Sequence, residues 1–369
     1  MFFDLSKPQR LLKQSVRDFA RREFSSEKVR DLMETEAGVD PDLWSEIADQ
    51  GWIGLHLPEQ VDGLGLGAVD LAVVAEELGY ACAPGPWLFV NWAATLLCAC
   101  GDTDIVPKLA EGISTATVAS HEFETGWSQK HDYLATSFDS AQMQLNGQKR
   151  LVCNAEHAKW LVVTALEADE FVIVLVPRET EGLSITVSPG MDQTRRYYEC
   201  VFDNVRVSQT QVLARGAKAE EAWEKAALVT TVAASAEMVG LMQWMLEATV
   251  EYSNTRKQFD KPIGSFQAVQ AKCADMLMHT ESARSATWYA AWALQEDDAD
   301  HAKAVSIAKA YVSDAVHKVG NMAIQAHGGI GFTWEHDLQL YYKRARADEY
   351  LLGDATEHRE RIASSIFSG

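Results

Sequence analysis

The chain has 369 residues, of which 47% are hydrophobic and 23% charged, values that are typical of globular proteins and exclude disordered and collagen-like chains. Its 33 basic side chains against 53 acidic ones leave a formal charge of −20 at pH 7. Such a surface repels DNA, RNA and anionic membranes, so we expect neither nucleic acid nor a membrane as a partner.

The cysteines and the apolar segments bear on the cellular compartment. The six cysteines are scattered through apolar stretches without a CxxC pair, which predicts reduced thiols in the cytoplasm. The N-terminal residues lack the charged segment and apolar core of a signal peptide. The most apolar run, residues 87–100, contains Asn91 and is shorter than the roughly 20 residues of a membrane span, so we predict a buried helix there.

Helical periodicity dominates residues 1–115. A first helix follows Ser6 and Pro8, and a second begins near Pro41. A third helical pattern, residues 69–78, stops at Gly79, which we interpret as its C-cap. These segments predict an N-terminal helical domain.

The pattern changes to short β-rich runs in residues 116–212. We predict strands within residues 116–120, 142–145, 160–165, 171–177 and 198–207. The dipeptides Asn146-Gly147 and Pro189-Gly190 are typical of turns between strands. The segment therefore predicts a small sheet or barrel.

Alanine-rich amphipathic segments fill residues 213–369 and predict a C-terminal helical domain. The whole chain thus predicts an α+β fold with an N-terminal helical domain (1–115), a middle β domain (116–212) and a C-terminal helical domain (213–369). No strand is followed by GxGxxG and a helix, so a Rossmann nucleotide site is not expected. No HExxH, His-rich or Cys-rich cluster in the sequence indicates a metal.

Two segments of the C-terminal domain carry residues suited to a nucleotide. In the first, Arg256, Gln258 and Phe259 stand where one helix ends and a turn leads to the next, near Phe266. An arginine offers paired donors to a diphosphate, and a phenylalanine offers a face to an aromatic ring. A solvated arginine beside a core phenylalanine would give the same pattern, so both interpretations stay open for this segment alone.

The second segment, residues 325–333, follows a helix predicted over residues 304–323. Gly328 and Gly329 would let a phosphate approach the main-chain N–H groups. His327 could contact a pyrophosphate or pack the loop, and the segment could also be a simple helix C-cap.

Considered together, the two segments make the chain resemble the acyl-CoA dehydrogenase family over nearly its whole length. The residues that carry the resemblance are Pro58-Glu59-Gln60-x-x-Gly63-Leu64-Gly65, Glu76-Glu77-Leu78-Gly79, Phe202-Asp203-Asn204-Val205-Arg206-Val207, Arg256-x-Gln258-Phe259-x-x-Pro262-Ile263-Gly264 and Gln325-x-x-Gly328-Gly329-x-Gly331-Phe332. The resemblance implies a four-helix bundle as the C-terminal domain and an FAD-dependent oxidoreductase that removes the C2 and C3 hydrogens of an acyl-CoA thioester. In the family a carboxylate takes one hydrogen as a proton, and FAD accepts the other as a hydride.

In this family FAD lies between two subunits. By matching motif, the contacts to the ADP half of a FAD seated mainly in the neighbouring subunit fall on Arg256, Gln258, Phe259, Gln325, Gly328 and Gly329.

Two stretches depart from the family pattern around the flavin ring. The family's Thr-Glu-x-x-x-Gly-Ser-Asp is almost wholly replaced over residues 119–128, and its Trp-Ile-Thr-Asn-Gly becomes Leu151-Val152-Cys153-Asn154-Ala155. Cys153 stands where the family has the threonine that bonds the flavin, and a cysteine is a poor hydrogen-bond donor. The chain's own flavin wall is therefore predicted to be degraded.

The residues at the positions of the catalytic base also differ from the family pattern. An ungapped count places the family's usual Glu at Leu352 and the alternative position, on an earlier helix, at Thr230. Neither residue is a carboxylate. A well-placed base raises the reaction rate roughly 10²–10⁴-fold, so its absence would matter for catalysis. Asp354 lies just beyond the first position and is the remaining candidate. Glu237 could be a buried base or an interhelical hydrogen-bond partner, and Glu247 is typical of a solvated helix face.

These departures favour a non-catalytic subunit that completes the FAD site of a catalytic partner in an α2β2 acyl-CoA dehydrogenase. By resemblance, such heteromers act on bulky steroid- or ring-derived CoA thioesters, and the family's usual electron acceptor is an electron-transfer flavoprotein. Two alternatives stay open: a self-sufficient homotetramer with Asp354 as base, and a flavin-free structural relative.

Overall fold

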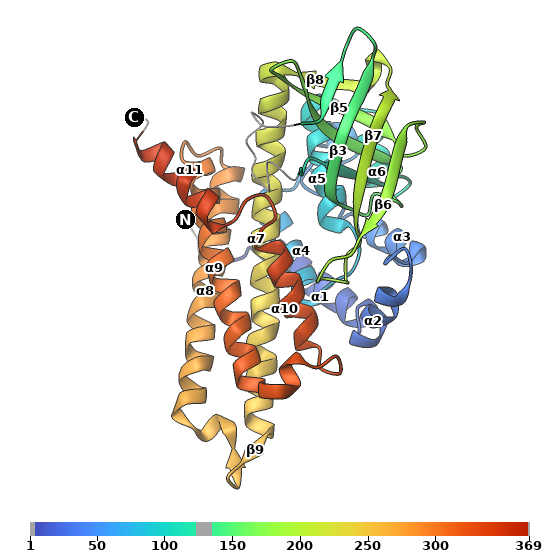
Figure 1. The fold of residues 1–369 in the computed structure, drawn as a ribbon. Helices are drawn as coiled ribbons and strands as arrows, with labels where there is room; N and C mark the ends of the chain where they lie inside the picture. Colours follow the sequence, from blue (N-terminus) through green and yellow to red (C-terminus); the bar gives the residue numbers. More distant parts are fainter. Residues whose placement is uncertain (1–3, 123–134, 368–369) are drawn as a thin grey trace. The chain divides into compact units, whose positions relative to one another are not determined.

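The computed structural model describes residues 4–122 and 135–367, and Figure 1 labels its helices and several of its strands. The chain forms two compact units, and each interleaves segments that are distant in sequence. The helical unit comprises Met1–Arg30, Ala68–Ala83 and Thr231–Gly369, and the sheet unit comprises Asp31–Gly67 and Pro84–Thr230. The three consecutive domain boundaries stay a prediction.

The helical unit consists mainly of long helices. Its helices are α1 (Lys7–Glu23), α4 (Ala68–Tyr80), α8 (Gln267–Gln295), α9 (His301–His327), α10 (Leu338–Asp348) and α11 (Ala355–Phe367). It also contains the short strands β9 (Lys257–Gln258) and β10 (Lys261–Pro262) and the 3-10 turns η3 (Ile263–Ser265) and η4 (Gly328–Phe332). Two helices, α2 (Ser26–Glu34) and α7 (Gly216–Thr255), run across a unit boundary. The predicted C-terminal helical domain is confirmed.

The first helices begin where their capping residues stand. The Ser6 hydroxyl accepts from the N–H of Gln9 at 3.4 Å, and the Gln9 side chain accepts from the N–H of Ser6 at 2.9 Å, which is a capping box at the start of α1. In the sheet unit, the carboxylate of Asp40 accepts from the N–H of Asp42 at 3.0 Å at the start of α3 (Pro41–Asp49). Both predicted helix starts are confirmed.

Gly79 is not a helix C-cap, so that prediction was wrong. α4 continues to Tyr80, and a Cβ on Gly79 would lie 2.1 Å from the carbonyl oxygen of Glu237 on α7. The reverse contact is equally tight, because a Cβ on Gly240 would lie 1.9 Å from the carbonyl oxygen of Glu76. Glycine is required at both positions for α4 and α7 to cross with their backbones in contact.

The sheet unit contains an eight-stranded sheet, which confirms the predicted middle sheet. Seven strands follow the order β6-β7-β3-β2-β4-β5-β8, and β1 pairs in parallel with β4. The strands are β1 (Ala116–Ala119), β2 (Ser137–Asp139), β3 (Gln144–Cys153), β4 (Trp160–Glu167), β5 (Glu170–Pro177), β6 (Leu183–Ser188), β7 (Tyr197–Arg206) and β8 (Val212–Arg215). The unit also holds α5 (Trp87–Cys100), α6 (Ile105–Ala110) and the turns η1 (Glu59–Val61) and η2 (Gln209–Gln211). Alternate residues of β4 and β5, among them Leu161, Val163 and Val174, form its core.

The dipeptide Asn146-Gly147 lies inside β3 and not in a turn, which corrects the sequence-based prediction. The pairing of β3 with β7 shifts register between Leu145 and Gly147. A Cβ on Gly147 would lie 2.6 Å from the Cα of Thr136, and the Asn146 side chain accepts from the N–H of Asn204 at 2.7 Å. A strand irregularity uses the same residue types as a two-residue turn, because both need unusual backbone angles.

Two apolar helices are core elements. α5 is buried along nearly its whole length, as predicted. α7 is long and apolar enough to cross a membrane, but 89% of its most apolar window is buried inside the protein. The hydrophobic composition of α7 therefore reflects its place in the core.

Candidate cofactor site

The first predicted motif forms a tight hairpin after α7. α7 ends at Thr255, and β9 then pairs with β10 in antiparallel register. The connecting residues Phe259 and Asp260 have φ angles of 52° and 63°, the left-handed conformation that two-residue hairpin turns favour. The N–H of Ile263 donates to the carbonyl oxygen of Arg256 at 2.9 Å. The backbone contact fixes Arg256 at the base of the hairpin.

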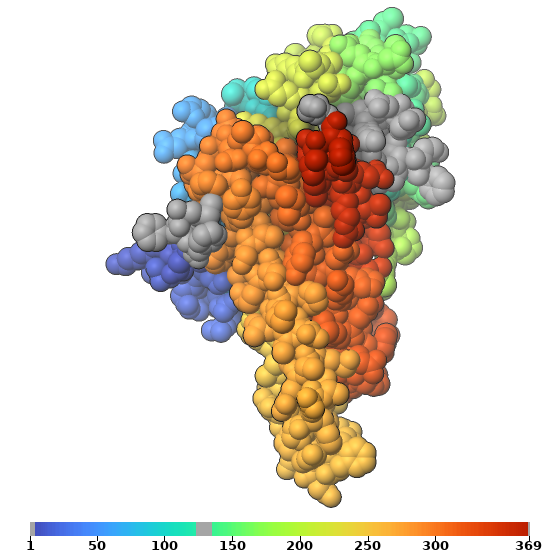
Figure 2. All heavy atoms as spheres, turned by 90° about the vertical axis from the view of Figure 1, so that its left-hand side faces the viewer, coloured from blue at the N-terminus to red at the C-terminus, as the bar shows by residue number. Residues whose placement is uncertain are grey.

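The side chains of this hairpin are open to solvent. Arg256 and Gln258 are exposed, and Phe259 exposes 86% of its surface. Neither the Arg256 nor the Gln258 side chain has a hydrogen-bond or ion-pair partner among residues 4–122 and 135–367. Figure 2 shows this region as the tip at which α7 and α8 meet. The donors of both side chains are therefore available to a ligand.

The second predicted motif ends α9 and turns through η4. Gln325 is exposed on the last turns of α9. Gly328 has a φ of 66°, and a Cβ on either Gly328 or Gly329 would meet no atom within 4 Å. The space beside both glycines is therefore open. A phosphate could approach the main-chain N–H groups there without meeting a side chain.

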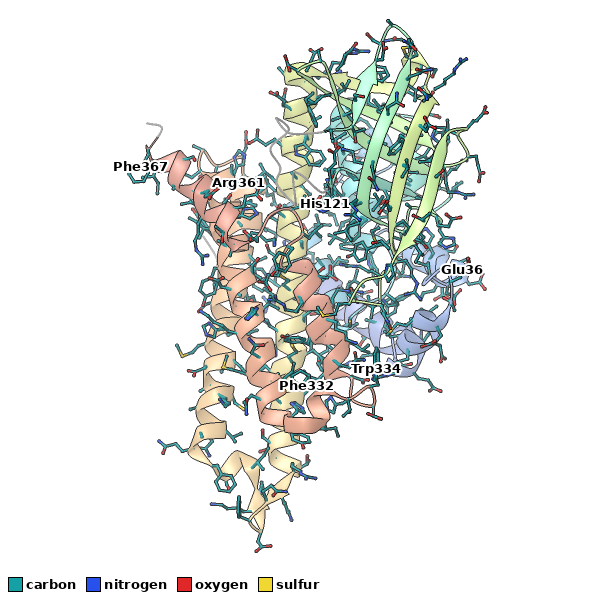
Figure 3. The ribbon with its side chains drawn as sticks, viewed as in Figure 1. Glu36, His121, Phe332, Trp334, Arg361 and Phe367 are labelled. Carbon is teal, nitrogen blue, oxygen red and sulfur yellow. The ribbon has the colours of Figure 1, made fainter. Side chains whose placement is uncertain are left out.

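An aromatic stack connects the two motifs. Tyr252, one turn before Arg256 on α7, stacks on the ring of His327 with 4.5 Å between ring centroids and 24° between planes. Figure 1 shows the hairpin and the α9–α10 turn at the same end of the helical unit, and Figure 3 labels Phe332 and Trp334 at that turn. The two motifs, distant in sequence, therefore lie at one end of the unit.

His327 packs the loop. Its ring is buried, and its Nδ1–H donates to the carbonyl oxygen of Ala323 at 2.8 Å. Burial lowers the pKa of His327, so the ring is neutral at physiological pH. Of the two roles considered for this residue, packing beneath the glycines of η4 is the one that the contacts support.

The exposed groups fit the ADP half of FAD. A guanidinium such as that of Arg256 can bind two phosphate oxygens at once, and the ring of Phe259 can stack on adenine. The amides of Gln258 and Gln325 can both donate and accept hydrogen bonds at the sugar or base. The role of each residue toward FAD stays a prediction.

The position that the sequence count assigns to the family's base holds a hydrocarbon side chain in a loop with defined contacts. Leu352 is buried with a φ of 61°, and Gly353 follows with a φ of 103°. The Nε2–H of His358 donates to the carbonyl oxygen of Leu352 at 3.0 Å. The chain's own contacts hold this loop in place, but the side chain at position 352 cannot accept a proton.

A buried lysine that the sequence analysis missed holds the start of the same loop. The ammonium of Lys309 on α9 donates to the carbonyl oxygens of Asp348 and Glu349 at 3.2 and 2.8 Å and to Ser313 Oγ at 3.1 Å. Burial lowers the pKa of Lys309 to about 8, although the neighbouring acids oppose the shift. The ammonium group supplies hydrogen bonds to carbonyl oxygens at the C-terminal end of α10, where a positive charge also interacts favourably with the helix dipole. In the sequence, only the position of Lys309 within an alanine-rich helix indicated that this lysine could be buried.

Asp354 caps α11. Its Oδ1 accepts from the N–H groups of Thr356 and Glu357, both at 2.9 Å. This is the arrangement of a helix N-cap, and it explains the carboxylate without a role as base. The assignment of Asp354 as a base stays a prediction.

The other candidate residues from the sequence have internal partners. Glu237 is buried and pairs with Arg344 at 2.7 Å, which supports the interhelical role. Glu247 is more than a solvated acid, because it accepts from the hydroxyl of Tyr80 at 2.5 Å. Burial and this hydrogen bond raise the pKa of Tyr80 to about 12. In the sheet unit, the hydroxyl of Thr230 donates to a backbone carbonyl one turn earlier at 2.8 Å.

The flavin-facing stretch predicted in residues 119–128 lies partly outside the described residues. Its described part ends at Glu122, which forms a buried ion pair with Lys149. Burial lowers the pKa of Lys149 to about 8. Burial also tends to raise the pKa of Glu122, but the charge of Lys149 and the N–H groups of Ala135 and Thr136 outweigh it and lower that pKa. This pair was not predicted, since its members are 27 residues apart in the sequence.

His358 is expected to make the chain sensitive to acid. Burial, followed by the charges of Arg361 and Lys309, lowers the pKa of His358 from 6.5 to about 3. Below pH 6.5 the unfolded chain binds a proton that the folded chain does not, so the free energy of unfolding falls as the pH approaches 3. We expect His358 to account for a loss of about 3 kcal/mol between pH 6.5 and about pH 4.

Urea unfolding at several pH values measures this loss. His358→Gln is the matched variant, because its amide can still donate to the carbonyl of Leu352 but does not titrate. The variant should lose about 3 kcal/mol less stability than the unmodified chain over that range. Equal pH dependence in the two proteins would show that another group is responsible.

Comparisons with known proteins bear on the family and the fold of the chain. The model described as acyl-CoA dehydrogenase, N-terminal domain, matches residues 6–112, and the model described as acyl-CoA dehydrogenase, C-terminal domain, matches residues 224–367. Acyl-CoA dehydrogenase IpdE2 of Mycolicibacterium smegmatis is 31% identical, over 98% of this chain and 100% of its own length. A solved variant of the steroid ACAD Tcur3481-Tcur3483 is 27% identical with a TM-score of 0.88, over 98% of each chain. The ChsE4-ChsE5 complex from Mycobacterium tuberculosis shares the fold, with a TM-score of 0.89 at 24% identity over the whole of both chains.

Proposed function

Because the chain belongs to the acyl-CoA dehydrogenase family, whose cofactor is FAD, we propose that it is the FAD-completing, non-catalytic subunit of a heteromeric acyl-CoA dehydrogenase. The assembly would be an α2β2 tetramer that carries out the α,β-dehydrogenation of an acyl-CoA thioester. This chain would contribute the cradle for the ADP half of FAD. The partner would contribute the base, the flavin wall and the acyl pocket.

One observation carries the proposal: the chain exposes the groups it can offer to a neighbour, whereas a leucine stands at the position counted for the family's base. Arg256, Gln258 and Phe259 are exposed and available to a ligand. Leu352, at the base position, is buried and apolar, while its loop keeps a defined conformation. A base contributes roughly 10²–10⁴ in rate, so a chain without one needs a partner to turn over its substrate.

In this arrangement each side chain has a binding or structural task. FAD, when bound, supplies the acceptor for the hydride. Arg256 pairs with the diphosphate, Phe259 stacks on the adenine, and the main chain at Gly328 and Gly329 admits the phosphate. Leu352 cannot take the α-proton, so the proton goes to a carboxylate of the partner subunit.

The substrate class and the electron acceptor follow from relatives. The steroid ACAD, at 27% identity, supports a bulky steroid- or ring-derived acyl group. The ChsE4-ChsE5 complex, which shares the fold, supports an assembly of two different chains. We propose an electron-transfer flavoprotein as the acceptor, in line with the family's usual partner.

Substituting Asp354 separates the heteromer from a self-sufficient homotetramer. Asp354→Asn should leave both turnover and stability unchanged, because asparagine is as good an N-cap as aspartate. Asp354→Ala should cost about 1 kcal/mol of stability through the lost cap and still leave turnover intact. Steady-state kinetics of the assembled enzyme, together with urea unfolding, measure both effects. A turnover that collapses in Asp354→Asn would identify Asp354 as the base and replace the heteromer with the homotetramer.

Expression of the chain alone and with an acyl-CoA dehydrogenase encoded beside it tests the proposed function. We expect a colourless protein alone and a yellow, active complex with the partner. A chain that is yellow and active alone would contradict the proposal. A chain that stays colourless in both preparations would also contradict it and would favour the flavin-free structural relative.

A further inference from the structure

A cavity of about 180 Å³ lies within the helical unit, away from the cofactor cradle. It is enclosed by residues of α1, α2, α4, α7 and α10, and none of the six cradle residues lines it. Its walls are mainly apolar and aromatic. They include Phe24, Val29, Trp244, Leu340 and Tyr341. The rings of Trp244 and Tyr341 stack at 3.6 Å with 2° between planes, which makes one wall flat and rigid.

Most polar groups at this cavity are already paired. Arg17 binds both carboxylate oxygens of Glu77, at 2.5 and 3.0 Å. Asp337 accepts from Arg30 at 2.8 Å. These ion pairs neutralise both acids, so neither presents an unpaired negative charge to a ligand.

Arg21 is the exception. It lines the cavity, is exposed, and has no hydrogen-bond or ion-pair partner for its guanidinium among the described residues. An exposed arginine next to an apolar cavity can donate to an anion at the rim, while the ligand's body is buried inside. The cavity therefore combines an apolar interior with one unpaired positive charge.

The volume limits the size of the ligand. A dry apolar cavity of about 150 Å³ in another protein accommodates benzene. A cavity of about 180 Å³ accordingly has room for one ring or a short branched chain. It has no room for a CoA thioester, whose nucleotide portion alone is far larger.

We propose that this cavity binds a small monocarboxylate with an aromatic or branched apolar body, oriented by Arg21 at the rim. The apolar body lies against the stacked rings of Trp244 and Tyr341. The carboxylate faces the guanidinium of Arg21. The site is independent of the cradle, so it does not depend on the proposed function.

Titration calorimetry of the full-length chain with benzoate tests the proposal, and isovalerate provides the branched alternative. We expect saturable binding at one site. Arg21→Ala should weaken it about tenfold, as expected for the loss of a charge-assisted hydrogen bond. Arg22→Ala is the matched control, because Arg22 is the adjacent exposed arginine, pairs with Glu23 and does not line the cavity. Benzyl alcohol, which has the ring without the charge, should bind about as weakly as benzoate binds to Arg21→Ala.

A second variant tests the interior. Ala81 lines the cavity and is half-buried, so Ala81→Leu should fill part of the volume and abolish binding. Circular dichroism of this variant checks that it is folded. The absence of saturable binding to the unmodified chain would overturn the proposal. Binding that neither Arg21→Ala nor Ala81→Leu alters would place the ligand elsewhere and would also overturn it.

Discussion

Replacing Arg256 with alanine is expected to release FAD from the assembled complex. The guanidinium is exposed at the base of the hairpin and is available to pair with two phosphate oxygens. The loss of two charge-assisted hydrogen bonds costs about 3 kcal/mol, or roughly a hundredfold in FAD affinity. The ratio of flavin to protein after extensive dialysis, and the affinity on adding FAD back, measure the effect.

Lys257→Ala provides the matched control for this experiment. Lys257 is the next residue, is equally exposed and is charged, but it lies outside the motif that matches the family. Its removal should leave FAD occupancy close to that of the unmodified complex. Full occupancy in Arg256→Ala, or equal losses in the two variants, would show that Arg256 is not a specific part of the cradle.

Replacing Arg344 with methionine is expected to destabilise the chain by about 3–5 kcal/mol, because Glu237 would remain buried without its cation. Arg344 pairs with Glu237 at 2.7 Å and donates to the carbonyl oxygen of Ala83 at 3.2 Å. The side chains of both ion-pair partners are almost fully buried, with 0% and 5% exposed. The pair therefore joins α10 to α7 in the core of the helical unit. The midpoint of urea unfolding measures the loss.

Two further variants identify the cause of that loss. Adding Glu237→Met to Arg344→Met removes the unpaired charge and should recover most of the stability. Arg359→Met breaks an exposed ion pair with Asp314 and should change the stability by less than about 1 kcal/mol. A double variant that is as unstable as Arg344→Met alone would attribute the cost to lost packing and not to a buried charge.

Local signals in the sequence were sufficient for the starts of α1 and α3 and for the strands β1, β4, β5 and β7. Ser6 caps α1 through a contact with a residue three positions away, and Pro41 opens α3 directly after its cap, Asp40. The long strands β4 and β5 have apolar runs that identify them without their partners. The α+β class and the order of helical and β segments follow from such local patterns.

The errors concern features that depend on a distant neighbour. Gly79 has the sequence context of a cap, and only the position of Glu237 on α7 shows why a glycine is needed within α4. The short strands β2, β6 and β8 are defined mainly by pairing with longer strands, so they were missed, and only the start of β3 was predicted. Asn146-Gly147 was assigned to a turn because the register shift that explains it involves β7.

In the candidate site, too, features carried by contiguous residues were predicted, and features that join distant segments were not. The motif around Arg256 and the glycines of η4 were predicted, because contiguous residues carry them. The stack of Tyr252 on His327 and the contacts of Lys309 with the α10–α11 loop were not predicted, because each joins separate helices. Leu352 could be located by counting, but its defined loop conformation is evident only from the structure.

The flavin content of the purified complex tests the central claim most directly. In the proposed function, each FAD takes a flavin wall from one subunit and an ADP cradle from its neighbour, and this chain would supply only the cradle. Quantitative flavin release, combined with the mass of the native complex, gives the number of FAD molecules per assembly. The account predicts two FAD for the four chains of an α2β2 tetramer, all lost when Arg256 is replaced in this chain. Four FAD per tetramer, or FAD bound to a tetramer of this chain alone, would contradict it.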